Sequence, residues 1–323
     1  MIASYQSLTG FNIYYWFATR DACYVEEDYY VNWEGKPLDE RGYFIWSSNI
    51  PAIQGLFPGA ALMFREGYVK QGEPVIIEER TLDDMWKLKR PIITEDQGHD
   101  ANRDSDITGK QNDAGSGVDS LVYLTGPVKV KYDAEKSNVY VKDLSKYIDK
   151  ANKTVRSVTG ELATDYGKGV FTVNTPRAKG AAGFLNKAGV INLGGATIEC
   201  ANDYLSIAFV SMDKLPLKTS KKILLQAASV MRPEGFETVP DIYEHKEDGK
   251  TTKYECERIV KTGHLPFVSE DFKVKATLDN AIVKKWHLLD SNGEIRESFD
   301  VTRNQSGAVE IALPADAMYI VLE

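Results

Sequence analysis

Three consecutive acidic residues, Glu26, Glu27 and Asp28, follow closely behind an aromatic run and are the best candidates for acid chemistry. Burial of one carboxyl against a tryptophan would raise its pKa and make it a general acid at neutral pH. Adjacent carboxylates more often form a solvated charged turn. The sequence therefore leaves two interpretations of this patch open, a weak catalytic candidate and an ordinary surface turn.

Aromatic side chains offer a second kind of chemistry, since the apolar face of a pyranose ring packs on a flat aromatic ring. Four of the five tryptophans lie near the start of the chain: Trp16, Trp33, Trp46 and Trp86. Trp33 stands between Asn32 and Glu34, and Trp46 precedes a polar stretch, so these two are the preferred sugar platforms. Trp16 lies inside an apolar run and is interpreted as a core residue. Each of the four is equally explained as a residue that seals this segment onto a sheet.

Oxygen-bearing side chains alternate in a polar loop, and such alternation is typical of ligands that wrap one calcium ion. The four residues are Asp100, Asn102, Asp104 and Asp106. An EF-hand is excluded because Ser105 replaces its glycine and Gln111 replaces its closing glutamate. A looser structural calcium site and a plain solvated loop both remain. No cofactor is required by any motif in the sequence.

Composition and charge narrow the classes of partner. The chain has 323 residues, of which 43% are hydrophobic, and its formal net charge is −8 at pH 7. This balance predicts a folded protein and disfavours binding to nucleic acid. The N-terminus lacks the pattern of a signal peptide, and no apolar run is long enough for a membrane span. Cys200 and Cys256 are expected to be either buried free thiols or a disulfide.

The order of elements predicts a mainly β protein. From Leu121 onward, about a dozen short apolar and alternating runs are typical of strands, and DSNGE at 290–294 predicts a hairpin with a type I′ turn. Trp286 falls in one such run and is predicted to be a sheet residue. Before residue 95 we expect short helices, one after Pro58 and one capped by Thr81 with Asp84, and a strand at 73–80.

These elements suggest three parts. Residues 1–94 form an irregular, aromatic-rich segment that contains short helices. Residues 95–119 are dense in Asp, Asn, Gly and Ser and are expected to be an acidic linker or loop. Residues 120–323 are expected to fold as an antiparallel, jelly-roll-like β-sandwich.

Several stretches resemble the C-terminal part of a clan A glycoside hydrolase of the β-galactosidase-like or cellulase-like kind. The stretches are SLTGFNIYYWFA, NIPAIQGLFPGAALMFREGYV, EPVIIEERTLDDMW and VFTVNTPRAKGAAGFL. The resemblance implies that Asn12–Phe17 is the last strand of a barrel and that a β-sandwich follows it. It also implies that the two catalytic glutamates lie upstream of Met1, because none of these stretches is a catalytic signature.

Three hypotheses follow for function. The first is a carbohydrate-binding or ancillary region that engages polysaccharide or oligosaccharide through aromatic platforms and lacks a complete hydrolytic centre. The second is a glycoside hydrolase whose site combines Glu26, Glu27 or Asp28 with the acidic loop 95–106. The third is a purely structural β-sandwich module that contacts another protein.

Overall fold

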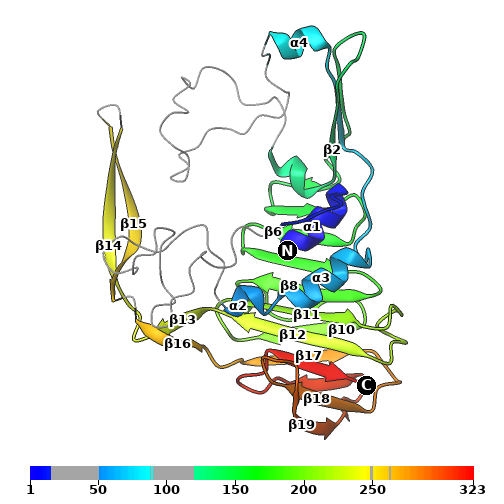
Figure 1. Cartoon of the computed structure of the whole chain (residues 1–323), viewed down its shortest axis with the longest axis vertical. Coiled ribbons are helices and arrows are strands. Elements are labelled where there is room, and N and C mark those ends of the chain that lie inside the picture. The colour runs from blue at the N-terminus through cyan, green and yellow to red at the C-terminus, as the bar shows by residue number, and fades with distance from the viewer. Residues whose placement is uncertain (16–50, 88, 90–119, 248–249, 262) are drawn as a thin grey trace.

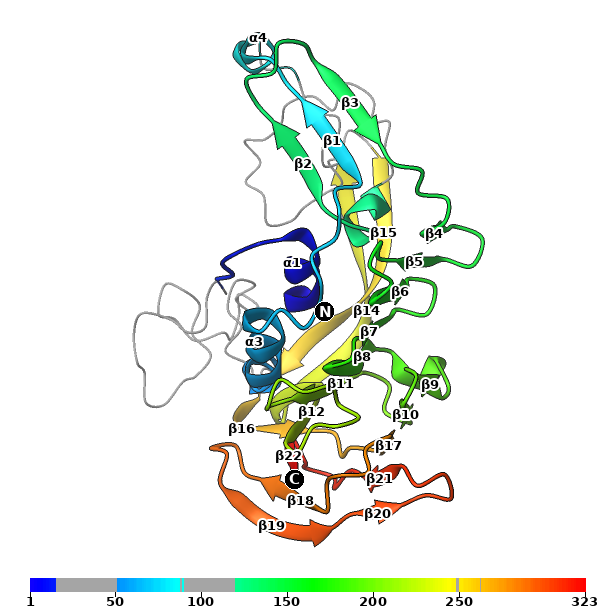
Figure 2. The ribbon, with the colours of Figure 1, turned by 90° about the vertical axis from the view of Figure 1, so that its right-hand side faces the viewer.

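The structure of the chain is a computed structural model that describes residues 1–15, 51–87, 89, 120–247, 250–261 and 263–323 (Figure 1). The protein is mainly β, with 44% strand and 13% helix, and its helices are short. Two antiparallel sheets, one large and one small, form a sandwich, and the short helices cover the outer face of the large sheet (Figure 2).

The large sheet has ten strands. In spatial order they are β19 (Ile295–Asp300), β18 (Lys285–Leu289), β22 (Tyr319–Leu322), β12 (Ile223–Ser229), β11 (Leu205–Ser211), β8 (Ala178–Gly183), β7 (Val170–Asn174), β6 (Leu162–Asp165), β5 (Thr154–Arg156) and β4 (Ile148–Asp149). The small sheet has five strands: β20 (Thr302–Arg303), β21 (Val309–Ala312), β17 (Val274–Leu278), β10 (Ala196–Cys200) and β9 (Ile191–Asn192).

The main core lies between these two sheets. Ile198 of β10, Phe209 of β11 and Leu225 of β12 are all fully buried there. Every residue of β12 is buried, because the small sheet covers one face of this strand and the helices cover the other. An apolar run without alternation is what such a doubly covered strand requires.

Helices α1 (Ile2–Thr9), α2 (Pro51–Gln54) and α3 (Phe57–Arg65) lie on the outer face of the large sheet (Figure 2). The backbone N–H of Gly59 donates to Gln226 Oε1 at 3.0 Å, and Gln226 Nε2 donates to the carbonyl of Leu56 at 3.0 Å. A Cβ atom at position 59 would lie 2.6 Å from the Gln226 side chain. Gly59 therefore lets α3 approach β12 closely enough to form these bonds.

A third, three-stranded sheet lies beyond the sandwich. Strand β1 (Ile76–Glu79) pairs in parallel with β2 (Val128–Lys131) and antiparallel with β3 (Asn138–Val141). Helix α4 (Leu82–Trp86) follows β1, and the 3₁₀ helix η1 (Ser120–Leu124) precedes β2. The boundary predicted near residue 120 is thus crossed, because β2 and β3 join the N-terminal part of the chain instead of the sandwich.

A two-stranded arm projects from the sandwich (Figure 1). Its base is the pair β13 (Met231–Glu234) and β16 (His264–Ser269), and its hairpin is β14 (Glu237–Glu247) with β15 (Lys250–Lys261). Exposed Cys256 lies on this arm, while Cys200 is buried in the sandwich, and both are free thiols. The two cysteines therefore form no disulfide, and only Cys200 is a buried thiol as predicted.

Several local predictions are confirmed. Thr81 Oγ1 accepts the N–H of Asp84 at 3.1 Å, and Asp84 Oδ2 accepts the N–H of Thr81 at 3.4 Å, which together form the predicted capping box of α4. The helix predicted after Pro58 is α3, although it begins at Phe57. The strand predicted at 73–80 is β1.

Two predictions need correction. The hairpin at 290–294 joins β18 and β19, but only Gly293 of the Asn-Gly pair has a positive φ, at +87°, so the turn is not type I′. The strand predicted at Asn12–Phe17 is wrong over its described part, because residues 11–15 carry no strand and α1 precedes them. Gly10, with φ of +80°, ends that helix in the left-handed conformation.

Among the described residues, no helix is long and apolar enough to span a membrane.

Candidate functional site

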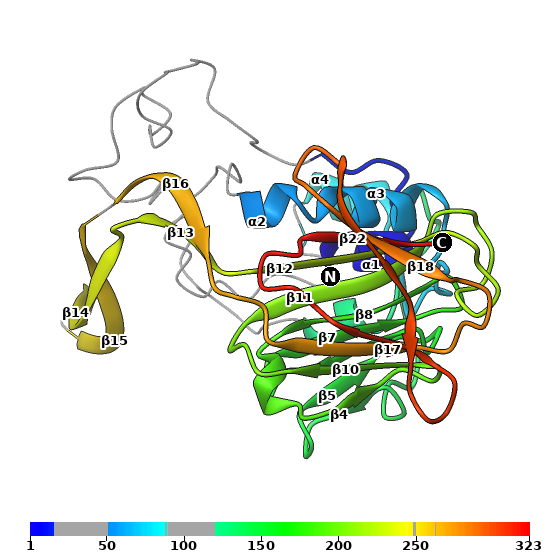
Figure 3. The same cartoon turned by 90° about the horizontal axis from the view of Figure 1, so that it is seen from below.

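The sandwich has two ends that differ in how they are covered. One end, called here the loop end, carries the loops 166–169, 184–190, 201–204 and 270–273. The strand register places three of these loops together, since Gly183 at the end of β8 pairs with both Val170 and Leu205. The opposite end, called here the anchored end, carries the loops 157–161, 175–177 and 212–222. The base of the arm also leaves from the loop end, where β13 follows β12 (Figure 3).

An exposed aromatic pair stands on the loop end. The rings of Phe184 and Tyr204 meet edge to face, with centroids 5.6 Å apart and an interplanar angle of 82°. Their residues are 37% and 41% exposed. Edge-to-face contact is a favoured arrangement of two aromatic rings and holds both in a fixed orientation. The pair is therefore a preorganised apolar surface that remains open to solvent.

Neighbouring residues fix the position of Phe184. Its N–H donates to the carbonyl of Gly169 at 3.1 Å, and Lys187 Nζ lies 4.4 Å from the centroid of its ring. A Cβ atom at Gly169 would lie 2.8 Å from Phe184 Cδ2, so only glycine leaves room for the ring there. Gly183 has φ of +124°, a conformation that other residues rarely adopt. The 3₁₀ helix η2 (Leu185–Lys187) then begins directly after the ring.

A polar hollow of about 320 Å³ lies at the same end. It is lined by Ala201, Asn202, Asp203, Glu270, Asp271 and Lys273. Asp203 precedes Tyr204 in sequence, and Asn186 Nδ2 donates to Asp203 Oδ1 at 3.0 Å, so η2 and the hollow are joined next to the aromatic pair. The loop between β10 and β11 thus supplies both an aromatic ring and part of the polar lining.

Asn202 braces this hollow from inside. It is only 3% exposed, its Nδ2 donates to the carbonyl of Asp271 at 2.8 Å, and its Oδ1 accepts the N–H of Lys273 at 2.8 Å. Because its amide is used in these bonds, Asn202 positions the loop 270–273. The lining side chains that face solvent are those of Asp203, Glu270, Asp271 and Lys273, all of which are exposed.

This combination suits the binding of a polyhydroxylated ligand. An aromatic surface accepts the C–H face of a sugar ring, and adjacent carboxylates and an ammonium group exchange hydrogen bonds with its hydroxyls. No group of three or more His, Cys, Asp or Glu residues that could hold a metal ion occurs within the part of the chain that the structure describes. The described geometry therefore favours ligand binding through rings and hydrogen bonds.

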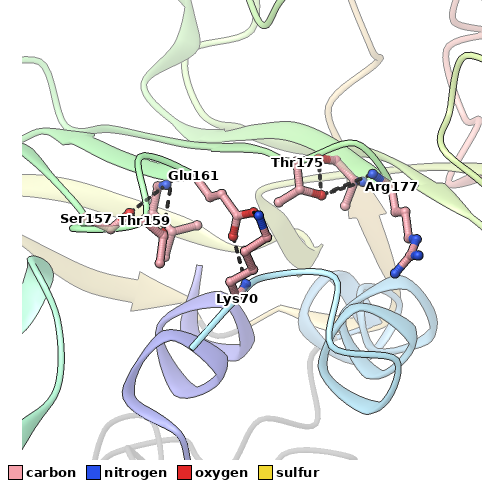
Figure 4. Close-up of polar contacts among 8 residues, drawn as sticks. Lys70, Ser157, Thr159, Glu161, Thr175 and Arg177 are labelled. Atoms are coloured by element: carbon pink, nitrogen blue, oxygen red, sulfur yellow. Dashed lines mark hydrogen bonds and ion pairs between the residues drawn. The ribbon is translucent and has the colours of Figure 1, made fainter. Parts of the chain in front are cut away.

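Polar side chains at the anchored end are used inside the protein (Figure 4). Glu161 Oε2 accepts the N–H of Lys70 at 2.7 Å, which ties the segment after α3 to the turn between β5 and β6. Thr175 Oγ1 accepts the N–H groups of Arg177 and Ala178 at 3.2 and 2.9 Å. These bonds close the turns of the sheet and leave their oxygens engaged.

Tyr68 and its partners complete this attachment. Its ring packs with Met63 against the sheet, and its hydroxyl donates to the carbonyl of Ser211 at 2.9 Å. The Arg177 guanidinium lies 5.7 Å from the centroid of the ring. Burial raises the pKa of Tyr68 despite the hydrogen bond with Ser211, which acts in the opposite direction.

Asp213 organises the loop between β11 and β12. Its Oδ1 accepts the hydroxyls of Ser220 and Ser211 at 2.7 and 2.9 Å, and its Oδ2 accepts the N–H of Lys221 at 2.7 Å. Burial opposes ionisation of this carboxyl, but the hydrogen bonds outweigh it and lower its pKa to about 2. Asp213 is therefore a structural carboxylate.

Most of the site residues predicted from sequence lie outside the described residues. These are Glu26, Glu27, Asp28, Asn32, Trp33, Glu34, Trp46, Asp100, Asn102, Asp104 and Asp106. Trp86, at the end of α4, is 84% exposed. Trp286 is a sheet residue of β18, as predicted, and stacks on Phe299 at 4.1 Å between centroids.

His287 takes part in a second arrangement that sequence inspection missed. Its Nδ1 lies 2.7 Å from Ser298 Oγ and its Nε2 lies 3.1 Å from Glu323 Oε1. The order of groups resembles a nucleophile, base and acid, but the three residues occupy neighbouring strands or their ends on a continuous sheet. We interpret it as a cross-strand polar contact of the kind that stabilises sheets. His287 is buried and hydrogen-bonded, which confirms the expectation of a satisfied histidine.

The loop-end residues gave little signal in the sequence. Phe184 and Tyr204 are separated by twenty positions, and each follows or precedes an ordinary strand. The strongest indication is the polar stretch Ala201–Asn202–Asp203 directly before Tyr204, which places an aromatic residue in a turn.

Comparison with known proteins adds no relative, because no family model, no curated protein and no solved structure matches the chain.

Proposed function

We propose that this chain is a carbohydrate-binding or ancillary region, related to glycoside hydrolases and without a complete hydrolytic centre, that engages polysaccharide at the loop end. The observation that carries the proposal is the Phe184–Tyr204 pair, two half-exposed rings in fixed edge-to-face contact beside a polar hollow. An apolar surface of this size in a monomeric protein calls for a ligand more than a charged turn does.

The geometry also supports an estimate of strength. The rings are already held by Gly169 and Lys187, so little side-chain entropy is lost when a sugar packs on them. The hollow is open to solvent, and its groups exchange water hydrogen bonds for sugar hydrogen bonds with small net gain. Binding is therefore expected to be weak for a single sugar and stronger for a chain that offers several rings.

Affinity electrophoresis of the full chain through gels that contain soluble polysaccharides tests the proposal. At least one polysaccharide should retard the protein, and Phe184→Ala and Tyr204→Ala should each reduce the retardation. Tyr140→Ala, which removes an exposed tyrosine of β3 away from the sandwich, is the matched control and should leave retardation unchanged.

The same gels separate the loop end from the platforms predicted at the front of the chain. If Trp33→Ala and Trp46→Ala abolish retardation while Tyr204→Ala does not, the binding surface is at the front and not at the loop end. Failure of every polysaccharide to retard the protein would contradict carbohydrate binding and favour a structural module.

A further inference from the structure

We infer that the loop-end site selects neutral sugar chains and rejects chains that carry carboxylates or sulfates. The inference rests on the proposed function, because it specifies the class of glycan that the same site takes. Its basis is the charge of the groups that face the hollow.

Negative charge dominates the solvent-facing lining. Asp203, Glu270 and Asp271 carry carboxylates at neutral pH, and Lys273 is the one cationic residue among the six that line the hollow. The nearest additional cation is Lys187, whose ammonium group already lies over the Phe184 ring. Net negative charge of the whole chain, −8, acts in the same direction at longer range.

Hydrogen-bond chemistry leads to the same class. Ionised carboxylates only accept hydrogen bonds, and sugar hydroxyls supply the donors that match them in short, charge-assisted bonds. The amide of Asn202, which could otherwise donate to a ligand, is engaged with the loop 270–273. A ligand carboxylate would bring further acceptors and no donor, so it would leave the acidic side chains of the hollow without partners.

Repulsion sets the size of the discrimination. Two like charges about 4 Å apart repel by about 1 kcal/mol in water and by about 4 kcal/mol at the lower dielectric typical of protein surfaces. With three carboxylates near the ligand, an acidic chain should bind at least about tenfold more weakly than its neutral counterpart. The difference should shrink as salt is raised, since a Debye length of about 3 Å at 1 M screens exposed charges.

One polymer in two charge states provides the probe. The neutral polysaccharide that retards the full chain most strongly is compared with the same polysaccharide after oxidation of its primary hydroxyls to carboxylates. We expect at least about tenfold weaker binding of the oxidised form at low salt and a smaller difference at 1 M salt.

Two double variants assign the discrimination to the hollow. Glu270→Gln with Asp271→Asn removes two lining charges and should narrow the gap between the polymers several-fold. Glu297→Gln with Asp300→Asn removes the same charge from exposed strand β19, away from the hollow, and should leave the gap nearly unchanged.

The outcomes separate this inference from the proposed function. Equal binding of the neutral and oxidised polymers, with both weakened by Tyr204→Ala, would overturn the charge selectivity and keep the sugar site. An equal effect of the two double variants would overturn the role of the hollow. Absence of binding to any neutral or acidic polymer would overturn the proposed function, and the inference with it.

Discussion

The anchored end and the loop end of the sandwich contain similar residue types in opposite environments. At the anchored end, Tyr68 is buried, with its hydroxyl bonded to Ser211, and Glu161 accepts a backbone N–H from Lys70. At the loop end, Tyr204 is half-exposed, and Glu270 and Asp271 line a hollow open to solvent. The same chemical groups therefore hold the fold together at one end and remain accessible to a ligand at the other.

This difference has a physical cause in what covers each end. Helix α3 and the segment that follows it cross to the anchored end, and a buried polar group there must find a partner inside the chain. The loop end has no such cover within the described residues, so its polar side chains keep their water and its rings keep their exposed faces. Variants at the anchored end should change stability, and variants at the loop end should change binding.

The largest effect on stability should come from Tyr68→Ala. Removal of a buried aromatic ring costs about 3–5 kcal/mol, and this variant also leaves the carbonyl of Ser211 without its donor. Urea denaturation measures the loss. Tyr68→Phe keeps the ring and should lose only about 1 kcal/mol. Equal losses in the two variants would show that the ring contributes little to the attachment.

Glu161→Ala should lower the free energy of unfolding by about 1–3 kcal/mol, because the buried N–H of Lys70 loses its acceptor. Lys70→Ala is the matched control. It keeps that N–H and removes only an ammonium group that is 77% exposed and 4.0 Å from the carboxylate, so its effect should be within about 0.5 kcal/mol. A larger effect of Lys70→Ala would mean that the ion pair matters more than the backbone bond.

Asp213 should make the anchored end sensitive to acid. Its pKa of about 2 in the folded protein is below its ordinary value of 3.8, so its contribution to stability is complete above about pH 4 and is lost as pH falls toward 2. After allowance for partial exposure, the loss should be about 1–2 kcal/mol. Urea titrations at several pH values should show this slope in the native protein and a shallower one in Asp213→Asn. An unchanged slope would contradict the role of Asp213.

Tyr204→Ala should have the smallest effect on stability and the clearest effect on binding. Its ring is half-exposed and contacts Phe184, so the free energy of unfolding should fall by less than about 1 kcal/mol. Retardation by the strongest polysaccharide should fall at least about tenfold, since stacking of this kind contributes most of the contact area. A stability loss as large as that of Tyr68→Ala would make Tyr204 a structural residue.

Much of the fold was predictable because it depends on local patterns. The capping box of Thr81 and Asp84 and the hairpin around Gly293 are encoded in a few consecutive residues. The parallel pairing of β1 with β2 joins Ile76 to Val128 and has no local signature, so the boundary near residue 120 was placed wrongly. The first helix was taken for a strand because its aromatic and apolar residues were counted without the left-handed stop at Gly10.

The site was harder to predict for a related reason. Phe184 and Tyr204 meet only because β8 and β11 are neighbours in the sheet, with Gly183 paired to Leu205. The hollow needs a third segment, 270–273, which reaches the site after the whole arm has been formed. Sequence spacing cannot reveal a contact of this kind, whereas tryptophan content drew attention to the front of the chain.

Mapping of amide chemical shifts by NMR on addition of the strongest neutral glycan tests the central claim most directly. The account predicts that the largest shifts fall at the loop end, in residues 184–187, 201–204 and 270–273, and that residues 157–161, 175–177 and 212–222 at the anchored end barely move. Shifts confined to the anchored end, or to the front of the chain, would contradict it.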